Sequence, residues 1–301
     1  MTLGPRLKIL VGLMLCLLAP ACASQGKGFS LEETSQRSPP PRKGNQGAQG
    51  ILRFAVIGDS GWGGRSQRAL ARRMCRFRQR RPFGLVITTG DNVYPDGARR
   101  RFGRAFYRPY SCLLNDGVRF HASLGNHDYV TALGRPELRA RAFGMRHRNY
   151  VVRSKGVRFV IADSNRLRER WLRRALTARK ADKWTIAVFH HPVYSPGPHG
   201  STVGLRPLLP RLLRRKEVHL VLNGHDHIYS YTKSLGGVRY VVTGGGGAPL
   251  YSCSNRWFTR MCREVHHFLF VAVHRKQIWV RAVPIEGPPF GLFRITTRSP
   301  A

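Results

Sequence analysis

The sequence predicts a four-layer αββα sandwich, in the mixed α/β (α+β) class, for residues 51–301. Strand-like apolar runs alternate with helix-like stretches in the earlier part of this region, a pattern typical of parallel strands covered by helices. The later part changes to consecutive strand-like runs. No repeat or low-complexity break interrupts the region, so we expect a single domain.

The expected elements can be placed in chain order from these patterns. The strands are Leu52–Ile57, Leu85–Thr89, Val118–Leu124, Tyr150–Arg153, Val157–Ala162, Thr185–Phe189, Val218–Leu222, Tyr229–Ser234, Val238–Thr243, Phe268–His274 and Gln277–Val283. The helices are Ser66–Gln79, Arg101–Leu114, Arg168–Ala178 and Leu205–Arg214. Lys155-Gly156 between two of the strands predicts a hairpin. In the third helix, Trp171, Leu172 and Leu176 share one face.

Residues 1–50 are expected to lie outside this fold. A charged start, an apolar run from Ile9 to Ala19 and the small residues Ala21-Cys22-Ala23 predict a secretory signal over residues 1–23. The Ser/Gly/Gln/Pro-rich residues 24–50 predict a flexible linker. Cleavage after Ala23 would leave a soluble protein, and cleavage before Cys22 would leave a lipid anchor as the only membrane attachment. Both alternatives predict an exported protein, which is periplasmic, secreted or held at a membrane surface.

The four remaining cysteines suggest two disulfides. They are Cys75, Cys112, Cys253 and Cys262. An even number of cysteines is typical of an exported, disulfide-bonded chain. Proximity in the sequence favours pairing Cys253 with Cys262, which leaves Cys75 for Cys112. Four buried free thiols are the alternative.

The formal net charge of +37 is extreme. It could mark an anionic partner, such as nucleic acid, anionic lipid or polysaccharide, or it could reflect arginines spread over solvated faces. We favour solvated faces, because the arginine clusters lie on expected helices and no aromatic-interleaved nucleic-acid motif accompanies them. A nucleic-acid partner is therefore not expected, whereas faster capture of anionic substrates is.

Five blocks of Asp, Asn and His each follow an apolar run. They are Gly58-Asp59-Ser60-Gly61, Gly90-Asp91-Asn92-Val93-Tyr94, Gly125-Asn126-His127-Asp128, Phe189-His190-His191-Pro192 and Gly224-His225-Asp226-His227. Ligand-bearing loops at the carboxyl ends of strands are the general rule for open α/β sheets. Oxygen and imidazole donors delivered there five times predict a shared metal centre. Two ions a few Å apart can clamp both reacting oxygens of a displacement at phosphorus.

Two blocks carry further information about the metals. His225 and His227 are two residues apart, so in an extended loop each can serve a different ion. Tyr94 is unusual because a phenol with a pKa near 10 becomes a ligand at ordinary pH only beside a strongly Lewis-acidic cation. A trivalent ion, Fe(III), is therefore expected at one position.

With these blocks in order, the chain resembles the calcineurin-like binuclear metallophosphatases, and among them the purple acid phosphatases of the tartrate-resistant type. The runs from Trp171 through Trp184 to Ser195, and Thr243–Leu250, fit the same resemblance. The resemblance implies a ligand set for each ion. The Fe(III)-like ion takes Asp59, Tyr94 and His227; the second, divalent ion (Fe, Zn or Mn) takes Asn126, His190 and His225; Asp91 bridges them.

The resemblance also implies residues that assist from outside the metals. His127 would bind phosphate and protonate the leaving alkoxide, and His199 matches a second histidine of this kind. We expect Asp128 and Asp226 to orient neighbouring loops or ligands. His191 is expected to make a local hydrogen bond. Asp163 is a weaker site candidate, with capping of its own loop as the alternative.

The implied function is an exported phosphatase of the acid phosphatase type. It would hydrolyse phosphate monoesters of small molecules or phosphoproteins by attack of a metal-bound hydroxide. A phosphodiesterase or nucleotidase of the same fold, with Mn or Zn and an uncoordinated Tyr94, is the alternative among enzymes. A non-catalytic, basic surface-binding protein with a vestigial metal site is the alternative from another class.

Overall fold

The computed structural model describes residues 52–297. The predicted signal and linker, including Cys22, lie outside the described residues. Within the described range, no helix combines the length and apolar character needed to cross a membrane.

The first of two sheets, sheet A, has the strand order β13-β12-β11-β1-β2-β3. Its strands are β1 (Leu52–Ile57), β2 (Leu85–Thr88), β3 (Arg119–Ala122), β11 (His267–Val273), β12 (Gln277–Pro284) and β13 (Phe290–Thr296). The pairs β1–β2 and β2–β3 are parallel, and β11 is antiparallel to β1. The carboxyl ends of β1, β2 and β3 therefore lie at one edge of the sheet.

The second sheet, sheet B, has the strand order β10-β8-β9-β7-β6-β5-β4. Its strands are β4 (Tyr150–Ser154), β5 (Val157–Ile161), β6 (Trp184–Val188), β7 (Leu220–Asn223), β8 (Tyr229–Thr232), β9 (Arg239–Thr243) and β10 (Thr259–Arg263). The central strands β5, β6, β7 and β9 are parallel. Their residues are almost all buried, as expected for parallel strands covered on both faces.

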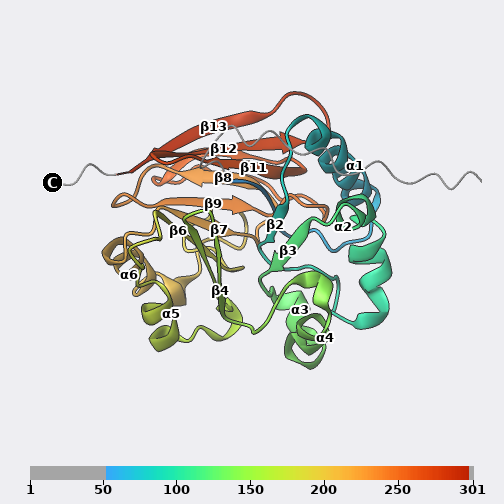
Figure 1. The fold of residues 1–301 in the computed structure, drawn as a ribbon, viewed down its shortest axis with the longest axis horizontal. Coiled ribbons are helices and arrows are strands. Elements are labelled where there is room, and N and C mark those ends of the chain that lie inside the picture. The colour runs from blue at the N-terminus through green and yellow to red at the C-terminus, as the bar shows by residue number, and fades with distance from the viewer. Residues whose placement is uncertain (1–51, 298–301) are drawn as a thin grey trace, which may run out of the picture. The chain divides into compact units, whose positions relative to one another are not determined.

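The two sheets pack against each other, and helices cover their outer faces (Figure 1). Phe54 of β1 meets Phe159 of β5 edge to face at 5.0 Å between ring centroids. Helix α1 (Arg65–Arg80) buries Leu70 and Met74 and lies against β11. On sheet B, α5 (Glu169–Ala175) and α6 (Leu209–Arg215) bury leucines in a second core. The predicted αββα class is confirmed.

The predicted helix 101–114 is broken into three short segments. A 3-10 turn at Arg99–Arg101, a π-helical turn at Gly103–Tyr107 and α2 (Ser111–Asn115) follow one another. Pro109 has no N–H to donate, so a regular helix cannot continue through it. The N–H of Arg108 instead bonds the carbonyl of Gly103 at 3.0 Å, five residues back.

Several short elements were not predicted from the sequence. They include α3 (Asn126–Val130), α4 (Arg135–Arg139), β10 and β13. Strand β10 has few apolar residues and is held by pairing with β8 and by a disulfide. Strand β13 lies at the edge of sheet A and leaves Leu292 half exposed.

Both predicted disulfides are present. Cys75 in α1 is joined to Cys112 in α2, and Cys253 is joined to Cys262 in β10. The first ties the outer helix of sheet A to the broken helical segment. The pairing expected from proximity in the sequence is thus confirmed.

A buried arginine in β5 fixes the end of α5. Arg158 is fully buried, and its Nη2 donates to the carbonyl of Leu176 at 2.7 Å. The last carbonyls of a helix have no partner within the helix, so this bond satisfies one of them. Asp182 lies 3.7 Å from Arg158 and 3.1 Å from Arg153. Burial acts to raise the pKa of Asp182, but the N–H of Arg179 and the two guanidiniums outweigh it and hold that pKa below its ordinary value.

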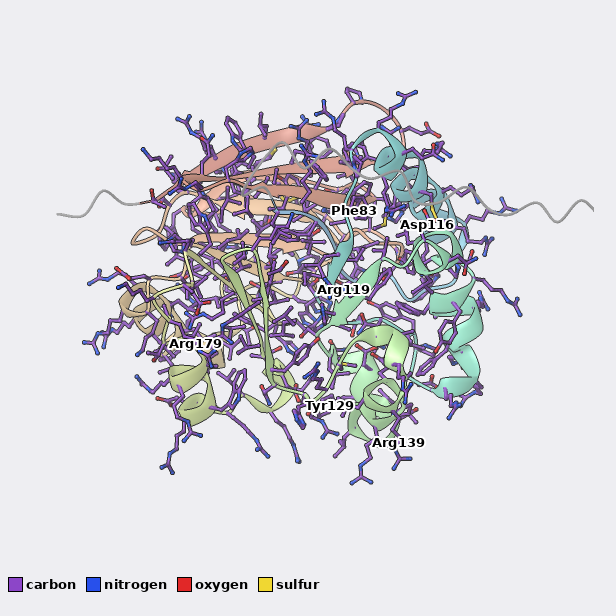
Figure 2. The ribbon with its side chains drawn as sticks, viewed as in Figure 1. Phe83, Asp116, Arg119, Tyr129, Arg139 and Arg179 are labelled. Carbon is purple, nitrogen blue, oxygen red and sulfur yellow. A yellow bond between two sulfur atoms is a disulfide. The ribbon has the colours of Figure 1, made fainter. Side chains whose placement is uncertain are left out.

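Other arginines project outward over much of the domain (Figure 2). Arg139 at the end of α4 and Arg179 after α5 are both exposed at its rim.

Candidate metal centre

All seven predicted ligands converge where the facing edges of the two sheets meet. Sheet A contributes the loops after β1, β2 and β3, which carry Asp59, Asp91, Tyr94 and Asn126. Sheet B contributes the loops after β6 and β7, which carry His190, His225 and His227. Strand order thus brings together donors separated by up to 168 residues in the chain, from Asp59 to His227.

One group of donors gathers around the phenol of Tyr94. The hydroxyl lies 3.0 Å from His227 Nε2 and 3.4 Å from Asp59 Oδ1. Asp59 Oδ1 and His227 Nε2 are 3.6 Å apart. Asp59, Tyr94 and His227 are the three residues that the resemblance assigns to one ion.

A second group gathers around the amide oxygen of Asn126. Its Oδ1 lies 2.9 Å from His190 Nε2 and 3.1 Å from His225 Nδ1. The two imidazole nitrogens are 3.2 Å apart. Asn126, His190 and His225 are the three residues that the resemblance assigns to the other ion.

Asp91 lies between the two groups. Its Oδ2 accepts a hydrogen bond from Tyr94 at 2.9 Å and lies 3.5 Å from His190 Nε2. Its Oδ1 accepts the backbone N–H of His127 at 3.0 Å, which fixes the carboxylate plane. This is the placement required of a bridging carboxylate.

The backbone at these positions is strained. Asp59, Asp91 and His225 have φ values of 55°, 51° and 73°, in the left-handed region that non-glycine residues rarely occupy. Such conformations cluster at functional sites, where the surrounding structure holds them. Asp59 is held in part by the backbone N–H of His225, which donates to its Oδ1 at 3.0 Å.

Gly125 allows the loop after β3 to approach Asp91. A Cβ at position 125 would lie 2.0 Å from Asp91 Oδ1 and 2.4 Å from the Asp91 nitrogen. No side chain fits there without moving the bridging carboxylate.

Backbone carbonyls set which ring nitrogens face the centre. His190 Nδ1 lies 3.0 Å from the carbonyl of Thr89, and His227 Nδ1 lies 2.7 Å from that of Pro249. Because a carbonyl only accepts, each Nδ1 carries the proton and each Nε2 is left as a lone-pair donor. This arrangement is typical of metal-ligating histidines.

Burial disfavours the ionised forms of the side chains in the two donor groups. Burial, then the charge of Asp91, raises the pKa of Asp59 well above its ordinary value. Burial, then the charges of Asp59 and Asp91, likewise raises the pKa of Tyr94. Burial also lowers the pKa of His227 to about 4 and of His225 to about 2, so both rings stay neutral. Bound cations would stabilise the ionised form of these buried acids, and the neutral imidazoles offer lone pairs to bind them. The residues present therefore fit two metal ions.

The two predicted outer histidines lie beside the donor groups. His127 Nδ1 lies 2.8 Å from the carbonyl of Pro95, and its ring is 4.5 Å from that of Tyr94. The His199 ring lies 4.5 Å from that of His225 and is exposed.

Asp128 fastens the loop after β2 to the start of α3. It is fully buried; Oδ1 accepts the backbone N–H groups of Asn92 at 2.9 Å and Val93 at 3.1 Å. Oδ2 accepts the N–H of Gly125 at 2.8 Å and the side-chain amide of Asn92 at 3.1 Å. Burial raises the pKa of Asp128 to about 6. Its contacts fit the expected orienting role.

Asp226 plays the equivalent part for the loop that carries His199. Its Oδ1 accepts the His199 N–H at 3.0 Å, and its Oδ2 accepts the hydroxyl of Ser195. The His199 loop is therefore anchored beneath the second donor group.

His191 makes the local hydrogen bond that was expected of it, and Asp163 makes the capping contact that was the alternative to a site role. His191 Nδ1 lies 2.8 Å from the hydroxyl of Ser164. Asp163 caps its own turn by accepting the N–H of Asn165 at 3.0 Å. Both residues thus also support the loop beside the second donor group.

Sequence reasoning missed four residues around the centre. Asn92 donates to Glu137 at 3.0 Å, and Glu137 is a buried acid of α4 with no recognisable motif. Trp62 packs at 5.3 Å on Tyr94, and Tyr251 stacks at 4.1 Å on His227. Asn92 lies inside a predicted block and could have been found, whereas the other three carry no signal beyond residue type.

A family model described as calcineurin-like phosphoesterase matches residues 52–229, more than half of the chain, so the chain belongs to that family. Purple acid phosphatase 4 of Arabidopsis thaliana is 26% identical over 319 residues, which cover 93% of this chain and 91% of the relative. The predicted family and its class, a metal-dependent phosphoesterase, are confirmed.

Solved structures agree on the fold. GAP50, described as the anchor in the inner membrane complex of Plasmodium, superposes with a TM-score of 0.73 at 18% identity, covering 83% of this chain and 90% of that one. The purple acid phosphatase PPD1 from yellow lupin seeds gives 0.69 at 17% identity, covering 83% and 54%. At these identities the likeness concerns the fold alone.

Proposed function

We propose that the protein is an exported, dinuclear phosphatase of the purple acid phosphatase type that hydrolyses phosphate monoesters. The observation that carries this proposal is the position of Tyr94. Its phenol lies within hydrogen-bonding distance of Asp91 and His227 and 3.4 Å from Asp59, inside one donor group. The phenol is thus placed where it could bind the same ion as Asp59 and His227, whereas the alternative with Mn or Zn leaves it uncoordinated.

The residues that would hold the metals follow from the two donor groups. Asp59, Tyr94 and His227 would bind Fe(III), Asn126, His190 and His225 would bind a divalent Fe, Zn or Mn, and Asp91 would bridge them. Because burial raises the pKa of Tyr94, its phenol would bind as a phenolate only beside a strongly Lewis-acidic cation such as Fe(III). When bound, the two ions would neutralise phosphate charge and activate water.

The chain's own side chains would manage substrate orientation and the leaving group. His127 is partly exposed, and its Nδ1 is committed to the carbonyl of Pro95. Its Nε2 is therefore the nitrogen left to bind phosphate or protonate a leaving alkoxide. His199 lies beside His225, with its backbone held by Asp226. Two histidines flanking the donor groups support assisted departure of an alcohol.

Two further observations support export. Both disulfides are of the kind that persists in an oxidising compartment. The predicted signal over residues 1–23 would deliver the chain there, with a lipid anchor at Cys22 as the alternative to release.

The proposal is tested by metal analysis, visible spectroscopy and hydrolysis assays on the purified protein reconstituted with iron. We expect about one tightly held iron per protein molecule, bound at the donor group that contains Tyr94, and a phenolate-to-Fe(III) absorption band. Tyr94→Phe should abolish that band, whereas Tyr107→Phe, at a partly exposed tyrosine outside the centre, should keep it. p-Nitrophenyl phosphate should be hydrolysed in preference to bis(p-nitrophenyl) phosphate.

Other outcomes would select the alternatives. An active but colourless, iron-free protein that prefers the diester would support the phosphodiesterase or nucleotidase hypothesis instead. A metal-loaded protein that hydrolyses neither ester would favour the non-catalytic reading, to which the complete donor set is the main objection.

A further inference from the structure

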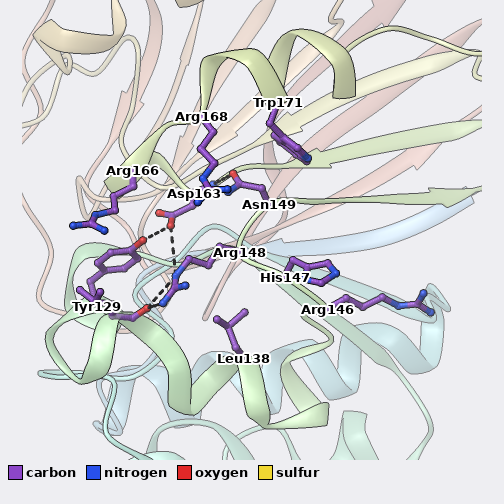
Figure 3. A pocket seen from close by; sticks show the side chains of 11 residues that line it. Tyr129, Leu138, Arg146, His147, Arg148, Asn149, Asp163, Arg166, Arg168 and Trp171 are labelled. Atoms are coloured by element: carbon purple, nitrogen blue, oxygen red, sulfur yellow. Dashed lines mark hydrogen bonds and ion pairs between the residues drawn. The ribbon is translucent and has the colours of Figure 1, made fainter.

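A cavity of about 480 Å³ is lined in part by residues of α3, α4 and α5. Figure 3 shows Tyr129 of α3 on one side of it and Trp171 of α5 on another, with Arg148, Arg166 and Arg168 around it. Arg146 and His147 complete the basic side of its lining. The cavity thus combines aromatic walls with four guanidinium groups.

The positive charge of this cavity is only partly neutralised by the residues that line it. Its only lining carboxylate is that of Asp163, which already accepts the hydroxyl of Tyr129 and the N–H of Asn165. Arg148 is 4.0 Å from Asp163 and also donates to the carbonyl of Leu133. Within residues 52–297, Arg166 and Arg168 form no ion pair with a carboxylate. Both are exposed and can receive an anion.

The cavity shares two of its walls with the metal centre. The turn that begins at Ser164 contacts His191 at 2.8 Å on the metal side and presents Arg166 to the cavity two residues later. Helix α3 carries Asn126 at its first residue and Tyr129 one turn later, in the cavity wall. The side-chain amide of Asn165 joins these walls by donating to the carbonyl of Gly125 at 3.3 Å. A molecule bound at the second donor group is therefore next to this cavity.

A second arginine-lined cavity, with no such connection to the metal centre, provides a comparison. It measures about 560 Å³ and is lined by Arg211, Arg214 and Arg215 of α6, on the outer face of sheet B. None of its lining residues belongs to the five ligand blocks. It supplies matched control positions for the cavity at Arg166 and Arg168.

We propose that the cavity lined by Arg148, Arg166 and Arg168 binds a second phosphate of the substrate, while a first phosphate is cleaved at the metal centre. The proposal rests on the proposed function and narrows its substrate class to small phosphate esters that carry at least two phosphates. Guanidinium groups suit this task because they pair with phosphate oxygens in a bidentate manner. Trp171 would contact the carbon framework that joins the two phosphates.

The test compares fructose 1,6-bisphosphate with fructose 6-phosphate, which lacks the second phosphate. The metal-loaded full chain is assayed for released phosphate as wild type, as Arg166→Gln/Arg168→Gln and as Arg211→Gln/Arg215→Gln. Loss of charge-assisted hydrogen bonds should lower the ratio of kcat/KM for the bisphosphate over the monophosphate about 10-fold or more in the first variant. The control variant, which removes the same charge, should keep the wild-type ratio.

Two results would overturn the proposal. One is an unchanged ratio in Arg166→Gln/Arg168→Gln; the other is an equal fall in the control variant, which would mean that the general positive field is responsible.

Failure of the proposed function is recognised separately, as absence of phosphate release from both sugars by the wild type. In that case titration calorimetry with fructose 1,6-bisphosphate still decides. Weaker binding by Arg166→Gln/Arg168→Gln alone supports the anion site, and equal binding by all three proteins refutes it.

Discussion

Replacing Asp128 by Asn tests whether this buried carboxylate organises the metal centre. Its two oxygens accept four hydrogen bonds, two each, from Asn92, Val93 and Gly125. An asparagine retains one acceptor oxygen and turns the other into an NH2 group. Whichever way the amide is oriented, two of the four donors then face another donor.

The expected loss follows from that count. A hydrogen bond to a charged group contributes about 1.5–3 kcal/mol, so Asp128→Asn should lower the free energy of unfolding by about 3–6 kcal/mol. Both loops that Asp128 joins carry predicted ligands, Asp91 on one and Asn126 on the other. We therefore also expect metal content to fall.

Urea unfolding of the metal-free protein at pH 8 measures the stability effect without interference from metal occupancy. At that pH the carboxyl of Asp128, with its pKa near 6, is ionised in the wild type. Asp116→Asn is the matched control, because Asp116 is 60% exposed and pairs with Arg78 at the surface. Such surface pairs contribute about 0–1 kcal/mol. If Asp128→Asn were no less stable than the control, the assignment of Asp128 as the organising carboxylate would be wrong.

Three further predictions concern stability and metal retention. Replacing both Cys75 and Cys112 by Ser should lower the free energy of unfolding, measured in urea, by about 3.8 kcal/mol. Replacing both Cys253 and Cys262 should lower it by about 2.6 kcal/mol, because the cysteines of this disulfide are 9 residues apart instead of 37 and it restricts the unfolded chain less. The reverse order would contradict this account. Gly125→Ala should displace the bridging carboxylate, lower metal content and lower the free energy of unfolding by about 1–3 kcal/mol. The control is Gly84→Ala, where a Cβ meets open space, and it should leave both metal content and stability unchanged. Because the folded protein holds the pKa of Asp182 below its ordinary value, its carboxylate stabilises the fold above about pH 4 and loses this effect as the pH falls further. Unfolding curves of Asp182→Asn should therefore depend less steeply on pH in that acid range, and an unchanged slope would argue against the ion pairs.

The sequence predicted which side chains come together in the two donor groups better than it predicted their arrangement. Each ligand block follows a buried strand, and the parallel strands then bring their carboxyl ends together, so the five blocks could be predicted from local patterns. The seven ligands within those blocks were implied by the family resemblance. The ring nitrogens of His190 and His227 that face the centre could not, because Thr89 and Pro249 select them through backbone carbonyls. Such contacts depend on loop conformation and leave no trace in residue type.

The fold was predicted in the same uneven way. Strand β1 was placed at its observed bounds, Leu52–Ile57, because buried parallel strands are continuous apolar runs. The helix expected over 101–114 was wrong in its continuity, since Pro109 interrupts its hydrogen bonding. Strand β10 was missed because its partner strand and a disulfide determine its conformation more than its own hydropathy does.

The division of the ligands between the two sheets has a mechanical consequence. Asp59, Asp91 and Asn126 follow strands of sheet A, while His190 and His225 follow strands of sheet B. Ions held by both sets would cross-link the two sheets at this edge. Occupancy and folding are then thermodynamically linked, so each tenfold rise in free metal above the dissociation constant adds about 1.4 kcal/mol per ion to the stability of the whole sandwich. A chelator would remove this contribution and so lower the free energy of unfolding of the protein.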